Sequence, residues 1–112
     1  MSLLRRQALM LSLTGFFATQ AQAQAPTPVF TLTIRNQAFE PASLEIPANQ
    51  KIELRITNAD AKPAEFESKD LRREKVIAPG QTASLFIGPL RPGRYEYYDD
   101  FRPTTRGHLI AR

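Results

Sequence analysis

Short runs in which apolar and polar residues alternate, separated by turns rich in proline and glycine, occupy most of this 112-residue chain. In residues 51–58, for example, Ile52, Leu54 and Ile56 alternate with polar side chains. This period of two is typical of strands that are buried on one face. No segment keeps the helical period over three turns, and nine prolines with five glycines favour turns over long helices. The sequence therefore predicts an all-β domain.

The alternating runs predict about seven strands, at residues 29–35, 43–46, 51–58, 75–78, 82–88, 94–98 and 106–111. Residues 36–41 are expected to turn the chain, with Phe39 directed inward. Residues 59–70 are expected to form a long polar loop, with one helical turn near residues 69–72. This many short strands favours a sandwich of two sheets. An oligonucleotide-binding barrel has fewer strands and displays aromatic residues on a basic face, so it fits less well.

The first 23 residues have the pattern of a secretory signal peptide. Arg5 and Arg6 precede an apolar stretch at 8–17, which is too short to span a bilayer. Ala21-Gln22-Ala23 is a small-x-small cleavage site. We expect export to the periplasm, with an uncleaved N-terminal anchor as the alternative. The arginine pair also leaves the twin-arginine export route open beside general secretion.

Removal of this segment would leave a short tether at 24–28 and one domain at 29–112, with no transmembrane segment. The whole chain has a formal charge of +4. Without Arg5 and Arg6, 13 basic residues face 11 acidic ones, which gives a charge of +2. Nucleic acid is therefore not an expected partner, because its binding rests on a strong positive field.

The absence of cysteine excludes whole classes of function. It excludes disulfide scaffolds, thiolate sites for zinc or iron–sulfur clusters, and the blue-copper centre, which needs a cysteine thiolate. His108 is the single histidine of the chain, so no site can use two imidazoles from one molecule. The chain also offers no pair of nucleophile and base. Enzyme activity is expected at most as ferroxidase-type chemistry carried by a bound metal.

Four motifs in the second half of the chain resemble the cupredoxins: Asn58-x-Asp60, Pro79-Gly80, Leu90-x-Pro92-Gly93-x-Tyr95 and Tyr97-Tyr98. Four further motifs resemble a narrower group: Glu65-Phe66-Glu67-Ser68, Glu74-Lys75-Val76, Ile87-Gly88-Pro89-Leu90 and Asp99-Asp100-Phe101-x-Pro103. That group is the small periplasmic cupredoxin-like proteins of bacterial high-affinity iron permeases, together with the similar domain of EfeO-type iron-uptake proteins. The resemblance implies a Greek-key β-sandwich. It also implies copper or iron binding, with a periplasmic iron-binding protein and a membrane iron permease as partners.

The resemblance also places a metal site. In copper cupredoxins the Tyr-Tyr strand leads to the cysteine ligand, but here Asp99 follows it, with Asp100 beside it. The loop that would supply the first histidine offers Glu65 and Glu67 instead. Carboxylates suit harder ions such as Fe(III), Mn(II), Ca(II) or Mg(II), and Cu(II) remains compatible with them. The expected ligands are therefore Glu65, Glu67, Asp99 and Asp100, around copper or iron and without a blue-copper centre.

Arg102 departs from the narrower group, whose members resemble Asp-Asp-Phe-His-Pro at this position. An arginine is always protonated and cannot ligate a metal. It could instead pair with Asp99, Asp100 or Glu65 and neutralise the carboxylate.

Two other residues are candidates for the surroundings of the ion. Glu74 could lie near the site or be an ordinary surface charge, and His108 could approach the same end of the sandwich from the last strand. The opposing interpretation is that the glutamates are ordinary exposed side chains and the aspartates form turns. The protein would then be a metal-free module for protein–protein interaction, with Arg102 in place of the ion.

Overall fold

The computed structural model describes Gly15 and residues 25–112. The predicted signal peptide at 1–23 lies outside the described residues except for Gly15, so export stays a prediction. The described strands begin at Val29 and end at Ala111. In the described part of the chain, no helix is long and apolar enough to cross a membrane.

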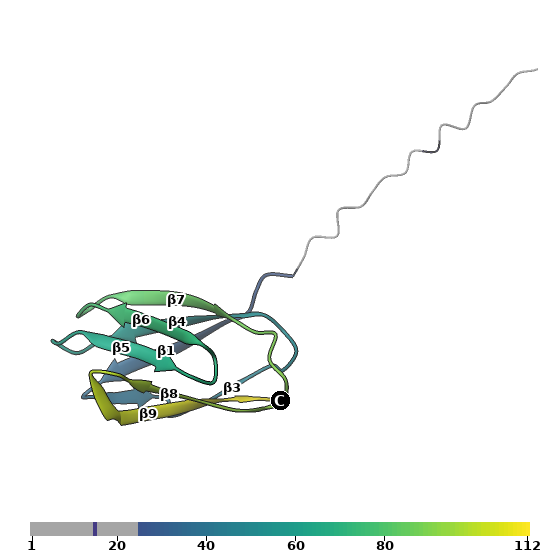
Figure 1. The fold of residues 1–112 in the computed structure, drawn as a ribbon. Coiled ribbons are helices and arrows are strands. Elements are labelled where there is room, and N and C mark those ends of the chain that lie inside the picture. Colours follow the sequence, from purple (N-terminus) through teal and green to yellow (C-terminus); the bar gives the residue numbers. More distant parts are fainter. Residues whose placement is uncertain (1–14, 16–24) are drawn as a thin grey trace, which may run out of the picture.

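Nine strands form two sheets that pack face to face (Figure 1). Their bounds are β1 (Val29–Arg35), β2 (Ala38–Glu40), β3 (Ser43–Ile46), β4 (Ile52–Asn58), β5 (Ala64–Ser68), β6 (Arg73–Ile77), β7 (Thr82–Ile87), β8 (Gly93–Asp99) and β9 (Arg102–Ala111). The four-stranded sheet has the order β2-β1-β4-β7, and the five-stranded sheet has the order β3-β9-β8-β5-β6. The pairs β1–β4 and β3–β9 are parallel, and the other pairs are antiparallel. The predicted all-β sandwich is confirmed.

The two strands beyond the predicted seven lie where the sequence predicts a turn and a loop. β2 was hidden in the turn at 36–41 because it is short and contains one large apolar residue, Phe39, which is buried as expected. β5 occupies part of the predicted loop at 59–70. Its two glutamates mask a clear alternation, in which Ala64, Phe66 and Ser68 are buried.

The predicted helical turn near residues 69–72 is instead a tight hydrogen-bonded turn. The Arg72 amide donates to the Lys69 carbonyl over 3.3 Å. Arg72 has a positive φ of 54°, which is incompatible with a right-handed helix. The turn leads directly from β5 into β6, so these two strands form a hairpin.

The core contains an aromatic cluster beneath β5 and β8. The Tyr97 and Phe39 rings meet edge to face with centroids 4.8 Å apart, and the Tyr97 and Phe66 centroids are 5.1 Å apart. All three side chains are buried. Such contacts stabilise the fold beyond the burial of apolar area. The cluster holds β5 and β8 in place at the end of the molecule where the polar residues gather.

Tyr97 also explains the glycine at position 107. The two residues are register partners on β8 and β9. A Cβ at position 107 would lie 2.6 Å from Cε2 of the Tyr97 ring, which is closer than packed carbon atoms approach. The ring therefore occupies the space that any larger residue at position 107 would need.

We predict that Gly107→Ala destabilises the domain by about 1–3 kcal/mol, because the buried ring must move to admit the methyl group. Chemical denaturation monitored by circular dichroism measures the change. Gly93→Ala is the matched control, since its new Cβ would meet nothing closer than 3.7 Å. Equal unfolding midpoints for the two variants would contradict the packing argument.

Candidate functional site

Asp99 is a fully buried carboxylate at the end of β8. Its Oδ1 atom accepts hydrogen bonds from the backbone amides of Glu65 and Phe101, each over 3.0 Å. The Asp100 amide donates in turn to the Glu65 carbonyl over 2.9 Å. These three bonds tie the start of β5 to the turn between β8 and β9, and they place Asp100 beside Glu65.

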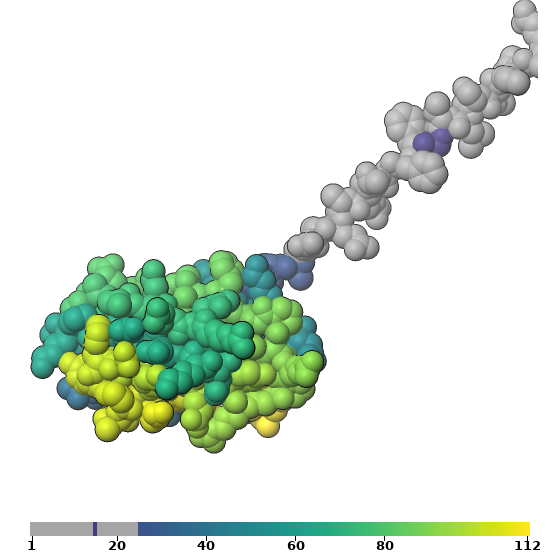
Figure 2. Space-filling view, in the orientation of Figure 1, coloured from purple at the N-terminus to yellow at the C-terminus, as the bar shows by residue number. Residues whose placement is uncertain are grey.

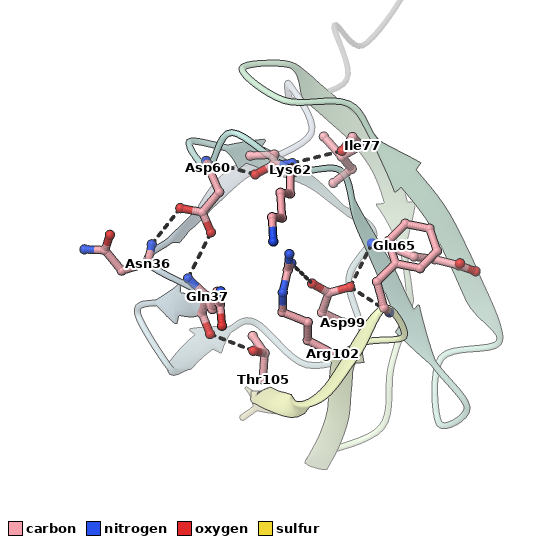
Figure 3. Close-up of polar contacts among 11 residues, drawn as sticks. Asn36, Gln37, Asp60, Lys62, Glu65, Ile77, Asp99, Arg102 and Thr105 are labelled. Carbon is pink, nitrogen blue, oxygen red and sulfur yellow. Dashed lines mark hydrogen bonds and ion pairs between the residues drawn. The ribbon is translucent and has the colours of Figure 1, made fainter.

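The second oxygen of Asp99 faces Arg102. Its Oδ2 atom lies 3.6 Å from Nη1 of Arg102, and the two side chains are 1% and 22% exposed. Figure 3 shows this ion pair; within the described residues, Oδ2 is buried and accepts no hydrogen bond. Of the three partners expected for Arg102, the structure therefore selects Asp99 over Asp100 and Glu65.

Three of the four predicted ligands converge: Glu65, Glu67 and Asp100. One carboxylate oxygen from each lies within 4.8 Å of the others. We call these three residues the acidic triad. Glu65 and Glu67 share the outer face of β5, because Phe66 between them points into the core. Asp99 does not join them, since its side chain points inward, where Oδ1 accepts from two backbone amides and Oδ2 faces Arg102.

The surroundings of the triad are negative. Loss of hydration raises the pKa of Glu65 above 4.5, and the charges of Asp100, Glu67, Glu74 and Asp99 raise it further, in that order. Glu74 stands opposite Glu67 in the β5–β6 pair, which places it near the triad. In the part of the chain that the structure describes, no lysine or arginine lies within 4.0 Å of a triad carboxylate.

Tyr98 is a neighbour of the triad that the sequence analysis does not identify. It pairs with Glu67 across β5 and β8. Burial raises the pKa of Tyr98, as do the charges of Glu67 and Asp100 and a hydrogen bond to Glu67, while Arg106 lowers it. The Arg106 guanidinium lies 5.0 Å from the centroid of the Tyr98 ring. Strand pairing, which the sequence alone does not give, is the signal that reveals this neighbour.

His108 lies apart from the triad. It is half-buried on β9 and stands opposite Glu96 on one side and Ser43 on the other. It lines a separate surface cavity with Glu96 and Arg106. His108 does not belong to the group of side chains whose ligand atoms converge with an ion-binding spacing.

In the space-filling view, β5 and β6 (teal to green) lie next to the yellow segment that follows β8, on the face turned to the viewer (Figure 2).

We predict that replacing the two neighbouring aspartates by alanine changes the stability of the domain by very different amounts. Asp99→Ala should destabilise the domain by about 2–4 kcal/mol, because two amides lose a buried acceptor and Arg102 loses its counter-charge. Asp100→Ala should change the stability by less than about 0.5 kcal/mol, because its side chain is exposed. Denaturation midpoints measure both. Asp99→Asn keeps an acceptor for the two amides and should lose less than Asp99→Ala. Equal losses for Asp99→Ala and Asp100→Ala would refute the structural role of Asp99.

The raised pKa of Glu65 gives a second prediction. Because the pKa in the folded protein exceeds the ordinary value of 4.5, Glu65 favours the folded state most below that value. That contribution is lost as the pH rises through the folded pKa. A carbon-13 NMR titration of the Glu65 carboxyl should show the raised pKa. In Asp100→Asn the pKa of Glu65 should move back toward 4.5, since the neighbouring charge with the largest effect on that pKa is gone. An unchanged titration curve in that variant would contradict the coupling.

Comparison with known proteins identifies the family. Residues 7–111 match the family described as cupredoxin-like domain. The protein RP394 of Rickettsia prowazekii (strain Madrid E) is 42% identical over 81 residues, which is 71% of this chain and 65% of that protein. The match therefore spans less than two thirds of this relative's length.

Solved cupredoxin structures share the fold. The purple cupredoxin from Nitrosopumilus maritimus superposes with a TM-score of 0.59 and 22% identity, over 73% of this chain and 98% of that one. A mutant of amicyanin in its reduced Cu(I) form superposes with a TM-score of 0.63 and 17% identity, over 80% of this chain and 88% of that one. A third structure is the Cu(I)-bound metal-binding domain of the Cu(I)-exporting ATPase CopA from Streptococcus pneumoniae. It superposes with a TM-score of 0.65 and 14% identity, over 75% of this chain and 84% of that one.

The donor set of this chain does not fit a blue-copper centre. The chain has no cysteine, and the residue after its Tyr-Tyr pair is Asp99, whose Oδ1 accepts from two backbone amides and whose Oδ2 faces Arg102. The triad carboxylates fit a hard cation instead. The family match over nearly the whole sequence and the shared sandwich agree with each other. The chain belongs to the cupredoxin-like domain family.

Proposed function

We propose that this protein is an exported cupredoxin-like accessory of iron uptake that binds a copper or iron ion on the acidic triad. The observation that carries the proposal is the convergence of three carboxylates within 4.8 Å. A cation would relieve their mutual repulsion, which adds to loss of hydration in raising the pKa of Glu65. The chain itself supplies no such cation within 4.0 Å in its described part.

The chemistry of the triad favours a hard, highly charged ion. Carboxylate oxygens bind such ions well, and a negative site stabilises Fe(III) relative to Fe(II). A bound iron or copper ion would supply one-electron redox chemistry, which no side chain of the triad can do alone. Glu65 and Glu67 would hold the ion from β5, and Asp100 would close the site from the turn after β8.

The cellular setting of the proposal comes from the sequence. The signal-peptide pattern at 1–23 supports a periplasmic location. The motifs shared with proteins of iron permeases support a periplasmic iron-binding protein and a membrane permease as partners. The triad lies on the outer face of the five-stranded sheet, with Asp100 exposed, which suits the transfer of an ion to another protein.

One observation favours a second candidate function, a metal-free module for protein–protein interaction. Arg102 places a fixed positive charge next to the buried Asp99. By the resemblance, Asp99 stands where copper cupredoxins have their cysteine ligand. In this candidate, the charge of Arg102 would take the place of the ion that copper cupredoxins hold at this end of the fold. The two candidates differ in whether the triad binds a metal.

Titration calorimetry with Mn(II), Cu(II) and anaerobic Fe(II) separates the two candidates. We predict binding tighter than millimolar, weakened about tenfold or more in Glu67→Gln. Glu45→Gln, which removes an exposed carboxylate on β3, is the charge-matched control and should bind like the parent protein. His108→Gln controls for binding to the lone imidazole.

Paramagnetic broadening by Mn(II) locates the site independently. The amide signals of Glu65, Glu67 and Asp100 should broaden first. Millimolar or weaker affinity, or equal affinity in Glu67→Gln and Glu45→Gln, would overturn the metal-binding proposal and leave the interaction module.

A further inference from the structure

A second polar concavity lies at the same end of the sandwich, and no triad residue lines it. Its volume is about 390 Å³, and its lining residues are Asn36, Gln37, Asp60, Ala61, Lys62 and Arg102. They come from the β1–β2 turn, the β4–β5 loop and the start of β9. We call this concavity the basic pocket. Its size falls at the low end of the range for small-molecule sites.

The walls of the basic pocket are fixed by hydrogen bonds that need no ligand. The two carboxylate oxygens of Asp60 accept from the amides of Asn36 and Gln37, over 2.7 and 2.9 Å. The Asp60 amide donates to Oδ1 of the fully buried Asn58 over 3.0 Å. The Thr105 hydroxyl donates to the Gln37 carbonyl over 2.6 Å. Three separate segments are therefore locked together around the pocket before anything binds.

Two cationic groups point into this space. Figure 3 shows the Lys62 amine and the Arg102 guanidinium directed toward the middle of the ring of side chains. In the described structure, no carboxylate lies within 4.0 Å of the Lys62 amine. Arg102 has one carboxylate neighbour, Asp99, at 3.6 Å, which is beyond ordinary hydrogen-bond distance. Most of the donors on both groups are thus free to meet a ligand.

The charges of the pocket select the kind of anion. Asp60 lines it and Asp99 lies beneath Arg102, so two negative charges partly offset the two positive ones. A singly charged carboxylate can use the guanidinium fork and the ammonium together. A doubly charged phosphate is attracted more strongly by the two cations and also repelled more strongly by the two aspartates, so the near balance of charge gives it no advantage over a carboxylate.

We infer that the basic pocket binds a small organic carboxylate between Lys62 and Arg102. The bound carboxylate accepts from both cations and relieves their mutual repulsion. This site is separate from the acidic triad, and it does not depend on metal binding there.

Nuclear magnetic resonance tests the inference with acetate as the probe, at constant ionic strength. Amide shifts of Asn36, Gln37, Ala61 and Lys62 should move and saturate below about 0.1 M acetate. Lys62→Gln should weaken binding about tenfold. Lys62 has no ion pair to lose, so this variant should fold like the parent protein. Lys51→Gln, which removes an exposed lysine stacked on Phe86, is the matched control and should bind normally.

Several outcomes would overturn the inference. Linear shifts up to about 0.1 M would show no site, because saturation would be absent. Equal affinity in Lys62→Gln and Lys51→Gln would place binding elsewhere. Tighter binding of inorganic phosphate than of acetate would contradict the choice of a carboxylate. Glu67→Gln should leave acetate binding unchanged, which distinguishes failure here from failure of the proposed metal site.

Discussion

The acidic triad and the basic pocket both depend on the contacts of the buried Asp99 carboxylate. Taking a carboxylate out of water is costly unless hydrogen bonds and an opposite charge replace its hydration. Here two backbone amides meet one oxygen and Arg102 approaches the other. The same contacts set Asp100 beside Glu65 and hold Arg102 at the wall of the basic pocket. The outer triad and the pocket are thus built from the two sides of one side chain.

Strand parity explains why two neighbouring aspartates have different chemistry. Successive residues of a strand point to opposite faces, so Tyr97 and Asp99 point inward and Tyr98 points outward, while Asp100 is exposed in the turn that follows β8. The inward carboxylate binds amides of its own chain, whereas the outward one joins a group of like charges. Loss of hydration raises the pKa of Glu65, and the repulsion within this group raises it further. The end of β8 thus separates a structural carboxylate from a solvent-facing acidic group.

Much of the architecture could be predicted from alternation alone, as at β4, whose observed bounds differ by one residue from the predicted 51–58. β5 was missed because its exposed positions are glutamates in a polar stretch, although its buried positions alternate cleanly. The shared face of Glu65 and Glu67 followed from their spacing. The inward position of Asp99 was open to the same parity argument, counted from Tyr97. The place of Lys62 was not, because a loop residue is positioned by contacts between distant segments, here those of Asp60 and Asn58.

The strand β6 has a consequence for how the molecule meets other proteins. It forms one edge of the five-stranded sheet, next to β5, and four of its five residues are exposed. Three of those four, Arg73, Glu74 and Lys75, carry charges of mixed sign. An edge of this kind discourages another chain from adding a strand. The charged border thereby works against self-association along the margin closest to the carboxylates, and it leaves their approach from solvent open.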